Sequence, residues 1–157
     1  MLPAPAWLAP VIASVALLLA CSSVDPVAGS DARSGRVVGK AAVIDGDTLE
    51  VGGRRVRLHG IDAPELRQRC GSDAARWPCG QRAAQALARR IGSRPVECRW
   101  READRWGRPI AWCRAGETDL SAWMVEHGWA LAFRRYASTY VVEEARARAA
   151  GRGLWTG

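Results

Sequence analysis

The tandem glycines Gly52 and Gly53 place the strongest local constraint on how this chain folds. Residues 37–44 and 49–58 are strand-like, and the two glycines divide the second run into two short arms in which apolar residues alternate with polar ones. Adjacent glycines between such arms favour a tight hairpin turn, because glycine adopts positive φ without strain. The domain is therefore expected to begin with a short β-hairpin.

The rest of the domain mixes helical and strand-like patterns. In chain order, the sequence predicts a helix over 81–91, strands over 95–100 and 109–114, a helix from Asp119 or Ser121 through His127, a short strand over 130–133 and a helix over 139–150. Strands that come first, with helices interleaved and then last, favour an α+β fold. Five short strands with a helix packed against them fit a small closed barrel such as the oligonucleotide-binding (OB) fold.

The N-terminal segment differs in composition from the rest. Residues 1–20 contain no charged side chain and end in a continuous run of small and apolar residues, which is typical of a secretory signal peptide. The residues just before Cys21 resemble a bacterial lipobox, so we expect a lipidated Cys21 that attaches the protein to a membrane; the alternative is a thiol that is free or removed with the signal. Residues 21–36 read as a flexible linker and 37–157 as the folded domain. The expected location is outside the cytoplasm, in the periplasm or cell envelope, or secreted.

Four cysteines remain in the expected domain: Cys70, Cys79, Cys98 and Cys113. In an exported chain an even number suggests two disulfides, for which three connectivities exist. Proximity in the sequence favours Cys70–Cys79 and Cys98–Cys113; the alternative is four reduced thiols. A zinc site is disfavoured because the spacings contain no CxxC pair.

Charge and aromatic content point to a polyanionic partner without establishing one. The net charge is +7, and Lys40 is the only lysine, so arginine supplies nearly all of the cations. Guanidinium groups suit phosphate well, although a GC-rich genome would also favour arginine. Of the eight tryptophans, most are assigned to the core, including Trp112. Trp106 lies in a polar turn and is a candidate stacking platform for a base or ribose.

Carboxylates that follow strand-like runs suggest a site for a hard divalent cation. Asp47 and Asp62 are the candidate ligands, and calcium would complete its shell with carbonyls, waters and substrate phosphate. Gly46 would let the chain turn so that Asp45 and Asp47 face the same pocket, with Asp45 as an indirect contact. Taken alone, Asp-Gly-Asp would be read as a plain turn.

The candidate catalytic residues are a glutamate and two arginines. Glu65 is the preferred general base for an attacking water, because a carboxylate is ionised near neutral pH. Arg57 and Arg108 would clamp a phosphate through bonds that strengthen as negative charge develops on its oxygens. His59 and His127 are less favoured bases. Taken singly, Glu65 is better explained as a helix-entry or surface glutamate, each arginine can be a solvated surface cation, and His127 can satisfy a helix dipole.

Three motifs together resemble the staphylococcal nuclease family. They are Asp-Gly-Asp-Thr at 45–48, Arg-x4-Asp-x-Pro-Glu at 57–65 and Asp-Arg-Trp-Gly-Arg at 104–108, and the resemblance covers about residues 36 to 155. The family implies a five-stranded OB barrel with three helices. It also implies a calcium-dependent nuclease that acts on DNA and RNA and leaves 3′-phosphate ends. We expect the protein to be a monomer.

Residue by residue, the resemblance assigns roles and also shows departures. It makes Asp47 and Asp62 calcium ligands, Arg57 and Arg108 transition-state stabilisers, and Glu65 the base-like residue. Ala63 stands where the first-described member has threonine, and only its backbone carbonyl would be needed as a ligand. The expected substrate contacts are Arg105, Trp106 and Tyr136; the turn aromatic is usually tyrosine, and two arginines before Tyr136 displace a tyrosine-rich run.

Two other classes of function compete with the nuclease. One is a noncatalytic OB-fold module that binds nucleic acid at the cell envelope. The other is an envelope lipoprotein whose barrel contacts proteins, for which a neutral or apolar face would be expected in place of the arginines. Retention of all five acidic and arginine residues favours the enzyme.

Overall fold

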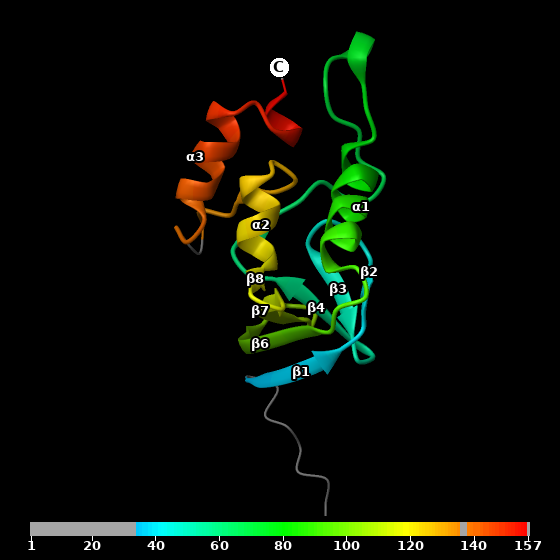
Figure 1. The fold of residues 1–157 in the computed structure, drawn as a ribbon, viewed down its shortest axis with the longest axis vertical. Helices are drawn as coiled ribbons and strands as arrows, with labels where there is room; N and C mark the ends of the chain where they lie inside the picture. Colours follow the sequence, from blue (N-terminus) through cyan, green and yellow to red (C-terminus); the bar gives the residue numbers. More distant parts are fainter. Residues whose placement is uncertain (1–33, 136–137, 157) are drawn as a thin grey trace, which may run out of the picture.

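The computed structural model describes residues 34–135 and 138–156. The strands are β1 (Gly35–Gly39), β2 (Ala41–Val43), β3 (Thr48–Val51), β4 (Arg54–Leu58), β5 (Ile61–Asp62), β6 (Val96–Ala103), β7 (Pro109–Ala115), β8 (Thr118–Asp119) and β9 (Leu131–Ala132). The helices are α1 (Cys79–Ile91), α2 (Leu120–Glu126) and α3 (Val141–Ala149), with short 3-10 turns η1 (Asp73–Ala75) and η2 (Gly153–Trp155). Figure 1 shows this order along the chain.

The main sheet closes into a barrel. Its strand order is β1-β6-β7-β4-β3-β2, and β8 adds to the edge of β7. Only Lys40 separates β1 from β2, so the first and last pieces of the sheet are two halves of one interrupted strand. The strand positions are then five, and the α+β OB-type fold is confirmed. Strand β1 includes Gly35 and Arg36, two residues that the sequence assigned to the linker.

One pairing in the barrel is parallel. Arg57 lies opposite Ile110 and Leu58 opposite Ala111, where β4 runs alongside β7; the other barrel pairings are antiparallel. A parallel pair requires a long crossover connection. Here the crossover contains β5, α1 and β6, and it carries the chain out of the barrel and back.

Both expected hairpins form. Gly52 and Gly53 have φ of 55° and 77°, the positive values that a tight hairpin between β3 and β4 requires. In the second hairpin, Cys98 on β6 lies directly opposite Cys113 on β7, and the two form a disulfide with a Cα–Cα distance of 4.1 Å. This covalent link fixes the register of the strands that flank the turn at 104–108.

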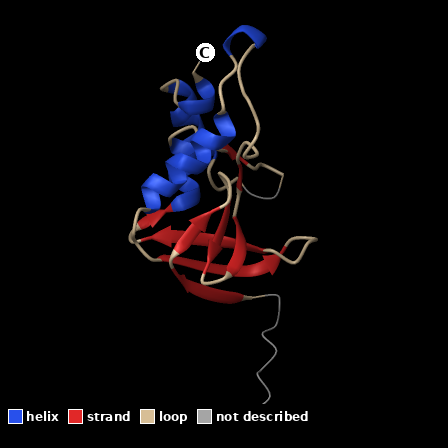
Figure 2. Cartoon of the chain, turned by 90° about the vertical axis from the view of Figure 1, so that its right-hand side faces the viewer, coloured by secondary structure: helices blue, strands red, loops and turns tan. Residues whose placement is uncertain are grey.

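The three helices gather at one end of the barrel, away from β1 (Figures 1 and 2). On α1 the predicted apolar face, Ala83, Leu87 and Ile91, is almost fully buried. Asp119 is the N-cap of α2, and its carboxylate accepts a hydrogen bond from the Ala122 N–H at 3.0 Å. Ala83 of α1 and Met124 of α2 lie against Gly46, so the helices pack at the end of the barrel where the loop before β3 lies.

The Cys70–Cys79 disulfide also forms, with a Cα–Cα distance of 5.6 Å. It ties the segment that follows Pro64 to the first residue of α1, and the loop carrying η1 projects beyond it (Figure 2). Within residues 34–135 and 138–156, no helix is long and apolar enough to span a membrane.

One tryptophan is not where the sequence suggested. Trp112 is 38% exposed, because it occupies an outward position of β7 between the buried residues Ala111 and Cys113. The prediction that it belongs to the core is wrong; hydrophobicity outweighed the strand alternation in that assignment. Trp123 and Trp129 do pack against the core.

Candidate active site

Arg57 holds two candidate ligands together. Its Nη2 atom lies 2.9 Å from Oδ2 of Asp47 and 2.8 Å from Oδ1 of Asp62. Asp47 comes from the loop before β3, and β4 and β5 supply the other two residues. The Leu58 N–H also donates to the Asp47 carbonyl at 2.7 Å. The two carboxylates predicted as a pair are thus brought to one point by a single guanidinium.

Asp47 is the most buried member of this group, with 4% exposure. Its carboxylate accepts hydrogen bonds from the Thr48 hydroxyl at 3.0 Å and from the Ala63 N–H at 3.2 Å. Burial raises the pKa of Asp47 to about 6, against the lowering effect of Arg57 and with a further contribution from Asp45. Asp45 shapes the loop, since its Oδ1 accepts the Asp47 N–H at 3.0 Å.

Gly46 contributes through close packing. A Cβ at this position would lie 2.6 Å from the Cβ of Ala63 and 3.1 Å from that of Ala83. Two chain segments therefore meet where Gly46 has no side chain. This close approach brings the Asp47 loop against the segment that carries Asp62 and Ala63.

Asp104 organises the turn that presents Arg108. Its Oδ1 accepts the N–H groups of Trp106 and Arg108, both at 2.9 Å, and its Oδ2 lies 2.7 Å from Nε of Arg108. Burial alone would raise the pKa of Asp104, but the hydrogen bonds from Arg108 and Trp106 lower it overall. Gly107 completes the turn with φ of 78°. Sequence reasoning gave Asp104 no separate role, although an aspartate that opens a glycine-containing turn is a signal for such bonding.

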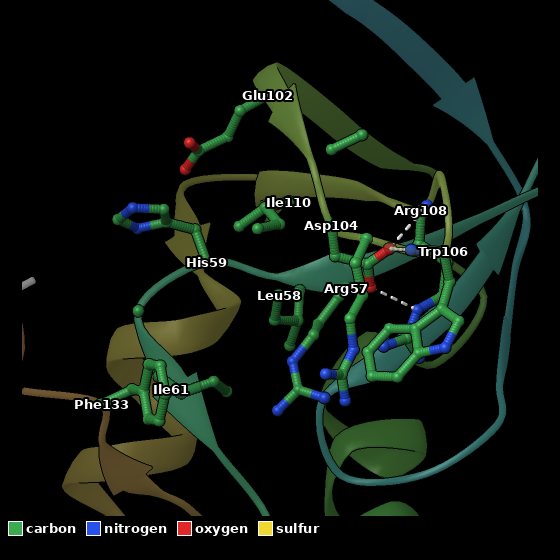
Figure 3. Close-up of a pocket in the computed structure, with 13 residues that line it drawn as sticks. Arg57, Leu58, His59, Ile61, Glu102, Asp104, Trp106, Arg108, Ile110 and Phe133 are labelled. Carbon is green, nitrogen blue, oxygen red and sulfur yellow. Dashed lines mark hydrogen bonds and ion pairs between the residues drawn. The ribbon is translucent and has the colours of Figure 1, made fainter. Parts of the chain in front are cut away.

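A pocket of about 600 Å³ lies between this turn and the end of β4. Arg57, Trp106 and Arg108 line it, together with Arg105 and His59. In Figure 3, Trp106 and His59 stand at opposite ends of the pocket, and dashed lines mark the bonds of Asp104. The two arginines predicted to clamp a phosphate therefore share one cavity.

Trp106 is 65% exposed at the edge of this pocket. The guanidinium of Arg105 lies 4.0 Å from its ring centroid, and that of Arg108 lies 5.2 Å away. An exposed indole flanked by cations can stack on a base whose phosphates the cations bind.

The remaining predicted residues lie elsewhere. Asp47, Asp62 and Glu65 do not line the pocket, so Arg57 is the link between it and the carboxylates. Glu65 is exposed, and its carboxylate forms no hydrogen bond or ion pair with any other residue of the described ranges. Tyr136 and Cys21 fall outside the described residues.

The backbone of Glu65 is nevertheless held firmly. Its N–H donates to Oε1 of Gln68 at 3.2 Å, and its carbonyl accepts the Gln68 N–H at 2.7 Å. A Cβ on Gly80, in the first turn of α1, would lie only 1.8 Å from that carbonyl. The Cys70–Cys79 disulfide joins the same two segments. Gly80 and the disulfide therefore fix the path of the chain at Glu65.

The available donors suit a hard cation whose shell is completed from elsewhere. Across residues 34–135 and 138–156, no three His, Cys, Asp or Glu side chains cluster as metal ligands. Asp47 and Asp62 nevertheless offer two neighbouring carboxylates, and hard divalent cations bind carboxylate, carbonyl, water and phosphate oxygens. The donor set is compatible with calcium or magnesium.

Glu144 on α3 contacts the strand that pairs with the Asp62 strand. It is 2% exposed, and its carboxylate accepts the Ala132 N–H at 3.1 Å and contacts Arg134. Strand β9, which carries Ala132, pairs with β5, where Asp62 lies. Arg134, which displaces an expected tyrosine, therefore serves as an ion-pair partner. Sequence reasoning missed Glu144 because nothing local distinguishes it from the surface glutamates of α3.

Comparisons with known proteins agree with this geometry. The staphylococcal nuclease homologue family matches residues 55–157. The chain is 38% identical over 123 residues to succinoglycan biosynthesis protein ExoI of Rhizobium meliloti (strain 1021), covering 76% of this chain and 64% of that protein. It is 36% identical over 132 residues to the micrococcal nuclease of Shigella flexneri, covering 73% and 70%. It is 32% identical over 103 residues to the probable staphylococcal-like nuclease CAN2 of Oryza sativa subsp. japonica, covering 64% of this chain and 26% of that protein.

The fold and the site place the protein in the class of OB-type barrels whose arginines and carboxylates converge at the ends of the strands. The family match covers most of the chain. The protein belongs to the staphylococcal nuclease homologue family. It spans less than two thirds of the Rhizobium relative and about a quarter of the rice relative.

Proposed function

We propose that this protein is a calcium-dependent nuclease that hydrolyses phosphodiester bonds in DNA and RNA and leaves 3′-phosphate ends. One observation carries the proposal. Arg57 contacts the carboxylates of Asp47 and Asp62 and also lines the pocket that Arg108 shares. A phosphate in that pocket would meet two guanidinium groups beside an anionic pair suited to a divalent cation.

The arginines would stabilise the charge that develops during hydrolysis. As water attacks phosphorus, negative charge accumulates on the non-bridging oxygens, and charge-assisted bonds from Arg57 and Arg108 strengthen with it. Asp104 holds the Arg108 guanidinium through Nε, so its position is set before substrate arrives. Such preorganised donors are effective because they need no reorganisation during the reaction.

Asp47 and Asp62, with the Ala63 carbonyl, would hold the cation. When bound, calcium would supply Lewis-acid polarisation of the phosphate and offset the negative charge of the two carboxylates. Burial of Asp47 and its bonds from Thr48 and Ala63 fix one carboxylate, while the more exposed Asp62 remains open to solvent.

Glu65 would accept the proton of the attacking water. The water oxygen forms a bond to phosphorus, the bond from phosphorus to O5′ breaks, and the departing O5′ takes a proton from solvent. Phosphate then remains on the 3′ end. The Glu65 carboxylate suits the role of base because it forms no hydrogen bond or ion pair with the other described residues, and its backbone is fixed by Gly80 and the Cys70–Cys79 disulfide.

Export and lipid attachment at Cys21 remain part of the proposal. Two disulfides support export, because such bonds persist in oxidising compartments. Fractionation of cells expressing the full chain, with a Cys21→Ser variant and labelling by a fatty acid, tests both statements. A fully cytoplasmic protein contradicts export, and a Cys21→Ser variant with unchanged labelling contradicts lipid attachment at this residue.

Digestion of plasmid DNA, single-stranded DNA and RNA tests the enzyme. Wild type, Glu65→Gln and the control Arg89→Gln, an exposed position on α1, are compared in calcium and in EGTA, with the ends of the products analysed. We expect calcium-dependent cleavage by wild type and the control, 3′-phosphate ends and a large loss in Glu65→Gln. Folded wild type that binds these substrates without cleaving them would instead identify a noncatalytic binding module.

A further inference from the structure

A row of basic and aromatic side chains crosses the outer face of the barrel. On β7, Trp112 pairs with Arg99 of β6, which in turn pairs with Arg36 of β1. His59 lies directly after β4, and its backbone N–H donates to the Ala111 carbonyl. The His59 ring stacks on Trp112 with centroids 4.1 Å apart. Figure 1 shows β1, β6 and β7 side by side. We call His59, Trp112, Arg99 and Arg36 the outer row.

The outer row begins at the wall of the active-site pocket. Arg57 pairs with Ile110, and both residues line the pocket. His59 and Trp112 lie two residues further along the same two chain segments, and because side chains alternate along a strand, Ile110 and Trp112 share one face of β7. His59 lines the pocket and contacts Trp112, so it joins the two regions.

A second hollow, of about 710 Å³, lies over this row. Arg36, Arg99 and Trp112 line it, together with Trp100 and Arg101. A register irregularity between Trp100 and Glu102 leaves Arg101 outside the regular ladder. Bulges of this kind redirect a side chain, and Arg101 has no ion-pair partner among the described residues.

Carboxylates moderate the positive charge of this face: Glu102 and Asp119 act electrostatically on His59, and Glu97 pairs with two arginines. Oε1 of Glu97 lies 2.8 Å from Nε of Arg36 and 2.5 Å from Nε of Arg99. The glutamate therefore holds the two guanidinium groups side by side and offsets part of their charge. With Arg101 included, three arginines face one glutamate, and an exposed tryptophan lies beside them.

We propose that the outer row, together with Arg101, binds the single-stranded nucleic acid that continues beyond the scissile phosphate. Trp112, supported from behind by His59, stacks on a base, while Arg99, Arg101 and Arg36 bind successive phosphates. From β4 to β1 the row crosses three strand spacings, or about 14 Å. Exposed aromatics in a basic groove are how OB folds bind single strands. The proposal rests on the proposed function, because it extends the path of that substrate.

Equilibrium binding tests the proposal separately from catalysis. A fluorescent single-stranded DNA of about 12 nucleotides, within the range that one OB fold covers, is titrated in EGTA so that cleavage does not interfere. We expect Trp112→Ala to raise Kd about five-fold or more, the lower limit for loss of one stacked base, and Trp112→Phe to retain most of the affinity. Unchanged affinity in folded Trp112→Ala would overturn the stacking role.

The arginines are tested by the salt dependence of Kd. Replacing Arg99 and Arg101 with glutamine should lower the slope of log K against log salt by about 1.4, or about 0.7 for each lost phosphate contact. The matched control replaces Arg82 and Arg89 on α1, which removes the same charge from another surface. Equal slopes for the two double variants would show that the arginines of this face act only through the overall charge of the protein, and would overturn the proposal.

Glu97→Gln supplies a test that misfolding cannot mimic. Because Glu97 offsets Arg36 and Arg99, its neutralisation should lower Kd for the same oligonucleotide and steepen the salt dependence. Weaker or unchanged binding would contradict the proposed path. If the wild type never cleaves but the outer-row variants lose affinity as described, the nuclease proposal fails and the binding surface stands. If the wild type cleaves normally and the variants bind as tightly as the wild type, the binding surface fails and the nuclease proposal stands.

Discussion

Asparagine at position 104 should disconnect Arg108 from its support and leave the turn intact. In Asp104→Asn the side-chain oxygen can still accept the N–H groups of Trp106 and Arg108, both at 2.9 Å in the wild type. The amide nitrogen then faces Nε of Arg108, where Oδ2 now lies at 2.7 Å, and two donors oppose each other. Arg108 therefore loses its fixed position.

The size of the effect follows from the same contacts. A hydrogen bond to a charged group contributes about 1.5–3 kcal/mol net. The side chains of Asp104 and Arg108 are 11% and 26% exposed, so solvent screening places this bond at the lower end of that range, about 1.5 kcal/mol of unfolding free energy. Removing a preorganised donor lowers kcat about 10²- to 10³-fold, and a displaced arginine should cost about 10- to 10²-fold.

A double-mutant cycle on single-stranded DNA cleavage provides the assay. The kcat/KM of wild type, Asp104→Asn, Arg108→Gln and the double variant are compared. If Asp104 acts through Arg108, the double variant is no slower than Arg108→Gln alone. Additive losses would refute the assignment of Asp104 as a positioning residue.

Three further perturbations follow from the packing around the site. Gly80→Ala should displace the Glu65 carbonyl, because a Cβ would lie 1.8 Å from this backbone oxygen, and should lower both the melting temperature and the kcat of the folded protein. An unchanged kcat would show that the backbone position of Glu65 is unimportant. Glu144→Gln should lower the free energy of unfolding by about 1–3 kcal/mol in urea titrations, because its charged bonds are lost while Arg134 stays solvated; no change would contradict a supporting role. Joint replacement of Cys70 and Cys79 by alanine should cost about 2–3 kcal/mol and slow cleavage, whereas wild-type melting and rates would show that the disulfide neither stabilises nor positions.

Much of the fold is readable from local pattern. Tandem glycines define the first hairpin, apolar spacing defines α1, and Asp119, one of the two predicted caps, is the N-cap of α2. Local pattern does not specify the parallel pairing of β4 with β7 or the closure across Lys40. Both depend on contacts between distant segments, for which a single sequence holds no signal.

The sequence predicted which residues form the candidate site but not the contacts that hold them in place. The motifs predict Asp47, Asp62, Arg57 and Arg108 as a group, and the structure brings them around one guanidinium and one pocket. The supporting residues were not predictable, because Asp104 and Glu144 act through partners set by tertiary packing. Trp112 was misassigned because its hydrophobic character outweighed its outward position in the alternation of β7.

Cleavage by Arg57→Gln is the decisive measurement, because among the described residues Arg57 is the one that both contacts the two carboxylates and lines the pocket. Single-turnover rates on single-stranded DNA are measured in calcium and in EGTA, with the fold checked by circular dichroism. We expect cleavage by wild type in calcium, none in EGTA, and a rate about 10²- to 10³-fold lower for folded Arg57→Gln. A variant that cleaves at the wild-type rate, or a wild type indifferent to EGTA, would contradict it.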